Sequence, residues 1–191
     1  MTRRVALVLL SVLSITGCGS MKSEDFAGQK PHFVVEDYFS GQTRAWGIFE
    51  DRFGDVRAQF TVEIDGKWDG KELVLDEDFL YADGRTDRRV WTIAKIDDNT
   101  YQGRAADVIG VATGRAFGNA LNWRYDIDLK VGGDKTYRVH FNDWMFLQPD
   151  GVLLNRARVT KWGIEVGEVT LVFAKNNHPI PQRPPRYSPQ P

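Results

Sequence analysis

The sequence predicts an all-β domain in which an antiparallel meander closes into a β-barrel of about eight to ten strands. The first observation is alternation, clearest in RAQFTVEID, where Phe60, Val62 and Ile64 share one face. The second is turn chemistry, because signals such as the Asp-Gly pair at residues 83–84 recur roughly every 10 to 15 residues. The third is that no helical period persists for about 12 residues between these turns. Closing the sheet would remove its exposed edges.

The chain of 191 residues is expected to hold one domain between a leader and a tail. We assign residues 1–17 to a signal peptide, 18–31 to a polar tether, 32–175 to the barrel and 176–191 to a disordered tail. The tail carries six of the eight prolines, so it cannot continue a central strand. Only EDYFSG, near the start of the barrel, suggests a short helical turn.

Composition argues against several classes of function. The formal net charge is −1 at pH 7 and no basic stripe is present, so nucleic acid is not an expected partner. One cysteine cannot form an internal disulfide or a cysteine-type zinc site, and the three histidines lack metal-ligand spacing. We therefore expect no metal and no cofactor. A serine hydrolase is not expected either, because the nucleophile-elbow motif is missing.

The single cysteine, Cys18, stands at the end of an apolar leader. Two arginines precede an apolar core of signal-peptide length, too short to span a membrane comfortably. The following Ile-Thr-Gly-Cys resembles a bacterial lipobox, which implies cleavage before Cys18 and acylation of its thiol and new amine. Two or three acyl chains anchor a protein stably. Gly19 favours the outer membrane, so we expect a lipid-anchored protein of the cell envelope, on the periplasmic face of that membrane. The alternative is a plain secretory leader with an incidental cysteine.

Long stretches of the chain resemble a known family. The resemblance is carried by LDEDFLYADGRTDRRVW, GNALNWRYDIDL and NDWMFLQPDGVLLNRARVTKWGIEVGEVTLVF. These are similar to the bacterial lipoproteins catalogued as domain of unknown function 3833, over roughly residues 26–175. The resemblance implies a small lipocalin-like (calycin-like) barrel anchored through a lipobox cysteine and encoded beside lipid-modifying enzymes. The family has no established activity, so it supplies no catalytic residues to carry over.

The first candidate polar cluster is Asp76 and Asp78, which share one face of a strand while Glu77 points to the other. Arg88 and neighbouring arginines follow the next turn, so a hairpin would bring them opposite these acids. Three interpretations stay open, namely cross-strand ion pairs, a cluster that faces a ligand, and acid–base catalysis.

The second candidate cluster lies in HFNDWM, where alternation places Asp143 on the opposite face from three polar or aromatic neighbours. Those neighbours are His140, Asn142 and Trp144. A buried Asp143 needs hydrogen bonds, because an unpaired buried charge is costly. We expect Arg156 and Lys161 of the next strand to be its partners. The cluster is either a structural network that fixes register or a polar anchor for the head group of an amphiphile.

Glycines 110, 114 and 118 recur in GVATGRAFG, which lacks the Gly-Lys-Ser/Thr ending of a phosphate loop. On a strand, such glycines indicate bends at a barrel corner or close packing over an aromatic ring.

Three functions fit these observations. The first, which we favour, is a binding module that holds a lipid, fatty acid or other apolar molecule and assists lipid modification in the envelope; it predicts a cavity of several hundred Å³. The second is a lipid-acting isomerase or lyase that uses Asp143, His140, Arg156 and Asp78. The third is a scaffold with a packed barrel. The candidate pocket or polar network comprises Asp143, Trp144, Arg156, His140, Asn142, Lys161, Asp76, Asp78, Arg88 and Trp91.

Overall fold

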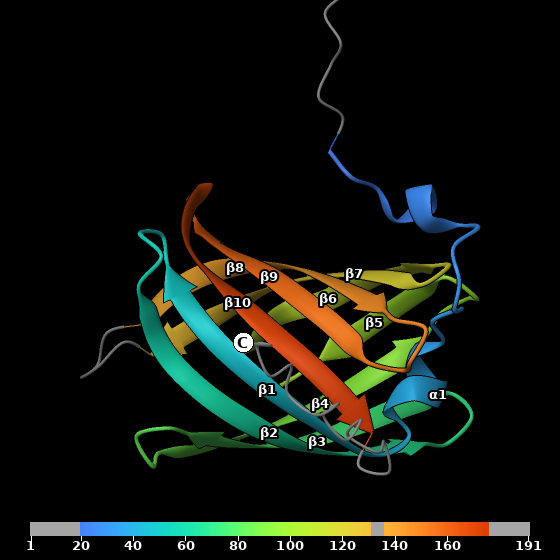
Figure 1. Ribbon diagram of the computed structural model, residues 1–191, viewed down its shortest axis with the longest axis horizontal. Coiled ribbons are helices and arrows are strands. Elements are labelled where there is room, and N and C mark those ends of the chain that lie inside the picture. The colour runs from blue at the N-terminus through green and yellow to red at the C-terminus, as the bar shows by residue number, and fades with distance from the viewer. Residues whose placement is uncertain (1–19, 131–135, 176–191) are drawn as a thin grey trace, which may run out of the picture.

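The computed structural model, which describes residues 20–130 and 136–175, confirms the all-β prediction. Ten antiparallel strands form a closed barrel in the order β1-β10-β9-β8-β7-β6-β5-β4-β3-β2 (Figure 1). The strands are β1 (Gly41–Asp51), β2 (Val56–Trp68), β3 (Glu72–Tyr81), β4 (Thr86–Lys95), β5 (Thr100–Arg104), β6 (Val108–Phe117), β7 (Ala120–Lys130), β8 (Thr136–Leu147), β9 (Leu153–Lys161) and β10 (Ile164–Lys175). Cys18, the leader and the proline-rich tail lie outside the described residues.

Two short helices precede the first strand. The 3-10 turn η1 covers Ser23–Phe26, and α1 covers Val35–Phe39, which matches the helical turn expected at EDYFSG. No helix among the residues described is long and apolar enough to cross a membrane.

The alternation read from the sequence separates the two faces of the barrel wall. In β2, Phe60, Val62 and Ile64 face the interior, as their shared face predicts. The wall closes where β1 pairs with β10, in a register that runs from Thr43 opposite Lys175 to Asp51 opposite Gly167. Apart from the β1–β10 pair, every pair of neighbouring strands in the barrel is consecutive in sequence, so the chain is a simple meander.

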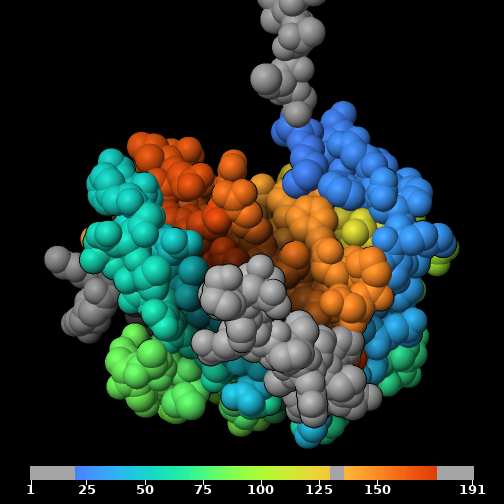
Figure 2. Space-filling model, viewed as in Figure 1, coloured from blue at the N-terminus to red at the C-terminus, as the bar shows by residue number. Residues whose placement is uncertain are grey.

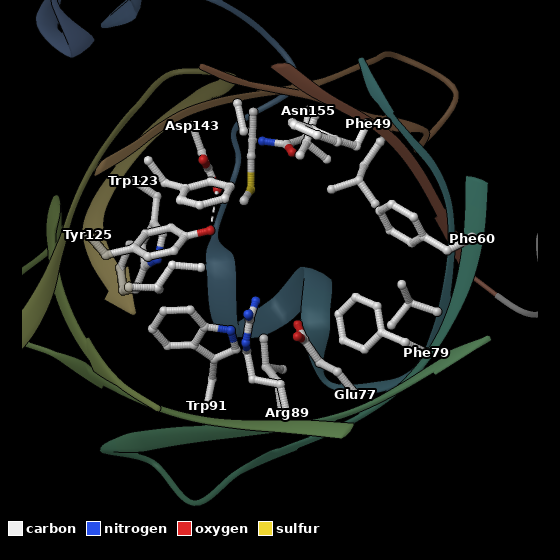
Figure 3. Close-up of a pocket in the computed structure, with 18 of the residues that line it drawn as sticks. Phe49, Phe60, Glu77, Phe79, Arg89, Trp91, Trp123, Tyr125, Asp143 and Asn155 are labelled. Carbon is white, nitrogen blue, oxygen red and sulfur yellow. Dashed lines mark hydrogen bonds between the residues drawn. The ribbon is translucent and has the colours of Figure 1, made fainter. Parts of the chain in front are cut away.

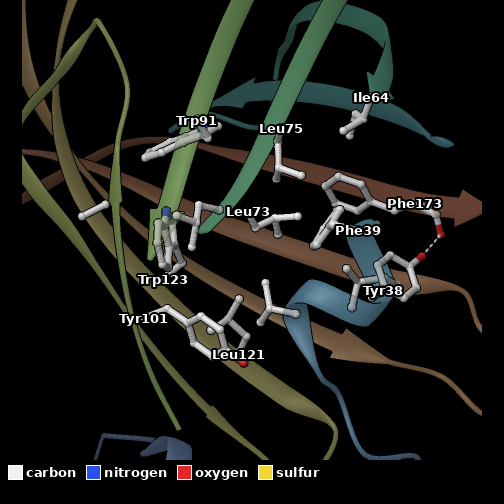
Figure 4. Packing of buried hydrophobic residues seen from close by; sticks show 14 of the residues in the cluster. Tyr38, Phe39, Ile64, Leu73, Leu75, Trp91, Tyr101, Leu121, Trp123 and Phe173 are labelled. Atoms are coloured by element: carbon white, nitrogen blue, oxygen red, sulfur yellow. Dashed lines mark hydrogen bonds between the residues drawn. The ribbon is translucent and has the colours of Figure 1, made fainter. Parts of the chain in front are cut away.

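Helix α1 closes one end of the barrel (Figure 4). The hydroxyl of Tyr38 donates a hydrogen bond to the carbonyl oxygen of Phe173 at 3.2 Å, and the Phe39 ring packs edge-on against Phe173. The residue opposite the end of α1 is Gly66, where a Cβ atom would lie 1.8 Å from the Phe39 carbonyl oxygen. Only glycine therefore lets the helix approach the sheet this closely.

A buried ion pair holds α1 in place. The carboxylate of Glu36 accepts hydrogen bonds from the Lys95 ammonium at 2.5 Å and from the Tyr101 hydroxyl at 2.8 Å. Burial alone would raise the pKa of Glu36, but these hydrogen bonds hold it below the ordinary value of 4.5. The charge is thus compensated, as a buried charge must be.

The segment expected to be a tether contacts the outer wall. The ring of Phe26 lies 5.8 Å from that of Trp144 and 5.4 Å from that of Phe146, centroid to centroid. Glu24 forms an ion pair with Arg115 at 2.8 Å. Figure 2 shows the blue N-terminal segment against the orange β8–β9 region. Residues 23–26 are therefore part of the folded domain.

Close packing over an aromatic ring, one of the two roles expected for the glycines of β6, occurs at Gly114. The indole ring of Trp123 packs directly against Gly114, so that a Cβ atom on Gly114 would lie 2.4 Å from the ring. A Cβ atom on Gly103 would sit 2.5 Å from the same ring. Gly110 and Gly118 instead adopt left-handed backbone angles, with φ of 72° and 54°, as bends require.

Gly114→Ala is expected to lower the free energy of unfolding by about 1–3 kcal/mol, because the new methyl group displaces the Trp123 ring from its packed position. Urea denaturation measures this loss. Gly28→Ala is the matched control, since nothing lies within 4 Å of its added Cβ, and it should change stability by less than about 0.5 kcal/mol. Equal losses in both variants would contradict this account of the packing.

Candidate ligand-binding site

The barrel encloses a cavity of about 400 Å³ (Figure 3), within the range of roughly 300–1,000 Å³ typical of small-molecule sites. Its floor is α1, through Val35 and Phe39. At the opposite end it is lined by Arg85, an exposed residue of the β3–β4 turn, so the cavity meets solvent there. The neighbouring β1–β2 and β9–β10 turns carry Phe53, which is 77% exposed, and Trp162, which is 89% exposed.

Aromatic rings form two opposite sides of the cavity (Figure 3). On one side, Trp91 packs edge-on against Trp123 at 5.7 Å and Tyr125 at 5.3 Å. On the other side, Phe60 lies 5.9 Å from Phe79. These rings make most of the lining apolar, and inward-facing aliphatic residues from β7 to β10 complete it.

Polar atoms reach the cavity from β8 and β9. The Tyr125 hydroxyl donates a hydrogen bond to Oδ2 of Asp143 at 3.5 Å. The other oxygen of this carboxylate, Oδ1, is buried and has no hydrogen-bond partner among the residues described. Asn155 donates to the Trp144 carbonyl oxygen at 3.4 Å, and its own Oδ1 is likewise unpartnered within the described chain. Two residues that line the cavity therefore each carry a buried acceptor oxygen that has no donor among the residues described.

A second polar group projects from β3 and β4. Glu77 and Arg89 lie opposite each other in the strand register and both line the cavity. The Arg89 guanidinium forms an ion pair with Asp107 at 2.5 Å, from the segment between β5 and β6. This guanidinium is thus already neutralised by a carboxylate of the protein.

Burial raises the pKa of two of these carboxyl groups. For Asp143, removal from water raises the pKa from 3.8 to about 7, although Tyr125 and Arg89 act in the opposite direction. For Glu77, burial raises the pKa from 4.5 to about 7 despite the nearby charge of Arg89. Glu77 is partly buried and lines the cavity. Burial is also the main cause that raises the pKa of Tyr125, and the negative charge of Asp143 is the second cause.

The first predicted cluster lies on the outside of the barrel. Arg88 donates two hydrogen bonds to Asp76, at 2.5 Å and 2.7 Å, and its Nε atom lies 3.9 Å from Asp78. These are the cross-strand ion pairs that the hairpin suggested. Glu77, between the two aspartates, is the residue of this run that faces the cavity.

Most of the second predicted cluster also lies outside, so the expected pairing of Asp143 with Arg156 and Lys161 is wrong. Arg156 lies opposite Trp144 on the outer face and pairs with Glu168 at 2.6 Å. Lys161 sits near the open end, with its ammonium 3.3 Å from the centroid of the Tyr137 ring. The physical reason is the pleat, because Asp143 lies opposite Ala157, and residues on either side of Ala157 point outward.

The remaining predicted residues have partners on the outer wall. His140 contacts Asp126 at 2.8 Å, and Asn142 accepts a hydrogen bond from Asn122 at 2.7 Å. Trp144 packs against Phe26. Of the ten residues proposed for a pocket or polar network, Asp143 and Trp91 line the cavity.

Sequence reasoning missed Glu77, Arg89, Tyr125 and Asn155 as cavity residues. The signal for Glu77 was its spacing from Leu75 and Phe79, which share its face of β3. The others are reached by the same parity on their own strands. Within the described ranges, no group of three or more potential metal ligands comes together.

Comparison with known proteins agrees with the fold and adds no activity. The family described as protein of unknown function (DUF3833) matches residues 12–175, which confirms the resemblance. No curated protein matches the chain. A crystal structure of a protein with unknown function from the DUF3598 family of Nostoc punctiforme is similar, with a TM-score of 0.51 and 18% identity. The match covers 77% of this chain and 51% of that one, so this chain spans about half of its length, and the likeness concerns the fold alone.

Asp143→Asn is expected to flatten the pH dependence of stability. Because the pKa of Asp143 is about 7 in the folded protein and 3.8 ordinarily, the folded state binds this proton more tightly than the unfolded chain. The resulting stability is fully present below about pH 4 and is lost as pH rises through about 7, a loss of up to about 4 kcal/mol. Urea denaturation between these pH values measures it.

Asp78→Asn is the control for this experiment, because the same change is made on the solvent-exposed face of the barrel. It should leave the pH profile as in the wild type. A profile for Asp143→Asn as steep as that of the wild type would contradict the burial of this carboxyl group.

Proposed function

Since the chain belongs to the family described as protein of unknown function (DUF3833), we propose a function from its own geometry: a lipid-anchored envelope protein whose barrel binds an apolar or amphiphilic small molecule. The observation that carries this proposal is the cavity of about 400 Å³, with an apolar, largely aromatic wall and a few polar groups, Asp143 and Asn155 on one side and Glu77 and Arg89 on the other. Such a combination is characteristic of sites that bury a small molecule and orient its polar end.

The cavity and its lining also favour a binding function over the two alternatives, a scaffold with a packed barrel and a lipid-acting isomerase or lyase. A scaffold would have a packed interior, whereas side chains leave this barrel hollow beyond α1. A lipid-acting isomerase or lyase was expected to use Asp143 with His140, Arg156 and Asp78. Only Asp143 of that set faces the cavity, so those four groups do not converge on one substrate.

The open end supports uptake of an apolar molecule. Exposed Phe53 and Trp162 stand in the turns beside the end lined by Arg85, and Leu80 and Ile164 are exposed at the same end. An apolar rim lowers the cost of transferring a hydrocarbon chain from another apolar environment into the cavity.

The sequence of the leader supports a location for this binding site in the cell envelope. The charged start, apolar core and lipobox-like end of the leader support acylation of Cys18. We propose attachment at the periplasmic face of the outer membrane, where the barrel would present its ligand to a membrane or envelope enzyme that modifies lipids.

Filling the cavity is expected to abolish ligand binding. Ala157 lies on the cavity wall, so Ala157→Phe should weaken binding of the neutral fluorophore N-phenyl-1-naphthylamine by at least about tenfold, measured by fluorescence titration. Ala58→Trp, nearer the open end, is a second variant in case the first is unstable. Leu154→Phe is the control, because Leu154 lies on the outer face of β9, the strand that carries Ala157, and this variant should bind as the wild type. Undiminished binding by both folded cavity variants would refute the proposed function.

Cys18→Ser is expected to release the protein from the membrane. In a Gram-negative host fed labelled palmitate, the wild-type chain should carry the label and sediment with outer-membrane vesicles, because several acyl chains anchor it stably. The variant should carry no label and lose its membrane association. Equal labelling of both chains would contradict the lipobox interpretation, whereas Ser20→Ala, two residues away, should behave as the wild type.

A further inference from the structure

We propose that the cavity selects amphiphiles whose polar end donates hydrogen bonds and carries no negative charge, a hydroxyl or ammonium head group, and that Asp143 and Asn155 accept those bonds. This inference rests on the proposed function, namely that the barrel binds an amphiphile, and it names the chemistry of the head group.

Two unsatisfied acceptors define the head-group site. Asp143 is 6% exposed and Asn155 is 2% exposed, yet each has one buried oxygen without a hydrogen-bond donor in the part of the chain described. A buried acceptor left without a donor is destabilising. Both side chains line the cavity, so a ligand bound there lies next to them.

The strand register brings these two acceptors close together. Asp143 of β8 lies opposite Ala157 of β9, and Met145 lies opposite Asn155, so Asp143 and Asn155 are diagonal neighbours on the inner face. Diagonal neighbours on one face of a sheet lie about 7–8 Å apart or less, a separation that one head group bridges. Figure 3 shows Asp143 and Asn155 on the same side of the cavity.

The charges in the cavity disfavour an anionic head group. Glu77 and Asp143 both contribute carboxyl groups to the lining. The cations among the described lining residues are Arg89 and Arg85, and each is engaged by an aspartate, Asp107 at 2.5 Å and Asp83 at 2.8 Å. A fatty-acid carboxylate would therefore meet like charges and find no free cation in the described wall. Of the ligands expected from the sequence, a fatty-acid anion thus fits less well than an alcohol or amine.

The aromatic sides of the cavity suit the hydrocarbon part of the same ligand. Phe60 and Phe79 lie across the cavity from Asp143 (Figure 3). A chain that extends from the acceptors toward these rings stays in contact with apolar surface. The head group and the chain are thus accommodated by different parts of one wall.

A displacement experiment with three ligands of equal chain length tests this inference. The full chain carrying Cys18→Ser, purified without detergent and loaded with N-phenyl-1-naphthylamine, is titrated at pH 8 with 1-dodecanol, dodecylamine and dodecanoate. The alcohol is kept below its solubility limit and the other two ligands below their critical micelle concentrations. The alcohol and the amine should displace the fluorophore at concentrations at least about tenfold lower than dodecanoate. The reason is that a hydroxyl or ammonium group donates hydrogen bonds to Asp143 and Asn155, whereas a carboxylate has no hydrogen to donate.

Variants assign the preference to its residues. Asp143→Asn keeps an acceptor oxygen but removes the charge, so it should lose the preference for the amine and retain that for the alcohol. Asp143→Leu combined with Asn155→Leu removes both acceptors, so the alcohol and the amine should each displace the fluorophore only at concentrations at least about threefold higher than with the wild type, with the fluorophore still bound. Asp78→Asn, outside the barrel, should match the wild type.

The outcomes separate this inference from the proposed function. Fluorophore binding with dodecanoate competing as well as the amine and the alcohol would overturn the head-group assignment and leave the binding function standing. Displacement by the alcohol and the amine at unchanged concentrations in the double leucine variant would also overturn it. A wild-type chain that binds neither the fluorophore nor any of the three ligands would refute the binding function itself.

Discussion

The pairing of β1 with β10 is the constraint on which the rest of the structure depends. It joins the first strand to the last, and it removes the two edges that a ten-strand meander would otherwise expose. Closure also turns one face of the sheet into an interior. Ten strands surround more space than the side chains of their inner faces and one short helix fill, so the cavity follows from the size of the barrel.

Helix α1 divides that interior into two parts with different roles. Near the helix, Phe33, Leu73 and Leu153 are almost completely buried and form a packed core. Beyond it, the same wall lines a space in which carboxyl groups are held away from water. The Glu36–Lys95 pair fixes where the packed part ends, because it holds the helix that forms the floor of the cavity. Stability and binding thus occupy opposite ends of one barrel.

Local chemistry in the sequence predicted the strands, their turns and the closed barrel, since alternation and turn residues act within a few positions of one another. It also predicted which residues share a face. It did not establish which face is inside where both faces are polar. In the run Asp76, Glu77, Asp78, the predicted site residues are the two that point outward, whereas Glu77 faces the cavity. The actual neighbours of Asp143 include Tyr125 and Arg89, from β7 and β4. Only the curvature of the barrel brings β4 toward β8, and no local pattern encodes that distance.

The contact of η1 with the barrel wall limits how an acylated chain could move. Cys18 and Ser23, the first residue of η1, are five residues apart in sequence, and such a segment reaches at most about 18 Å when extended. Because Phe26 packs against Trp144 and Phe146, acylation of Cys18 as proposed would hold the barrel within this distance of the bilayer, with the flank that carries η1 nearest to the lipids. The proposed anchor would therefore confine the ligand site to the vicinity of one membrane surface.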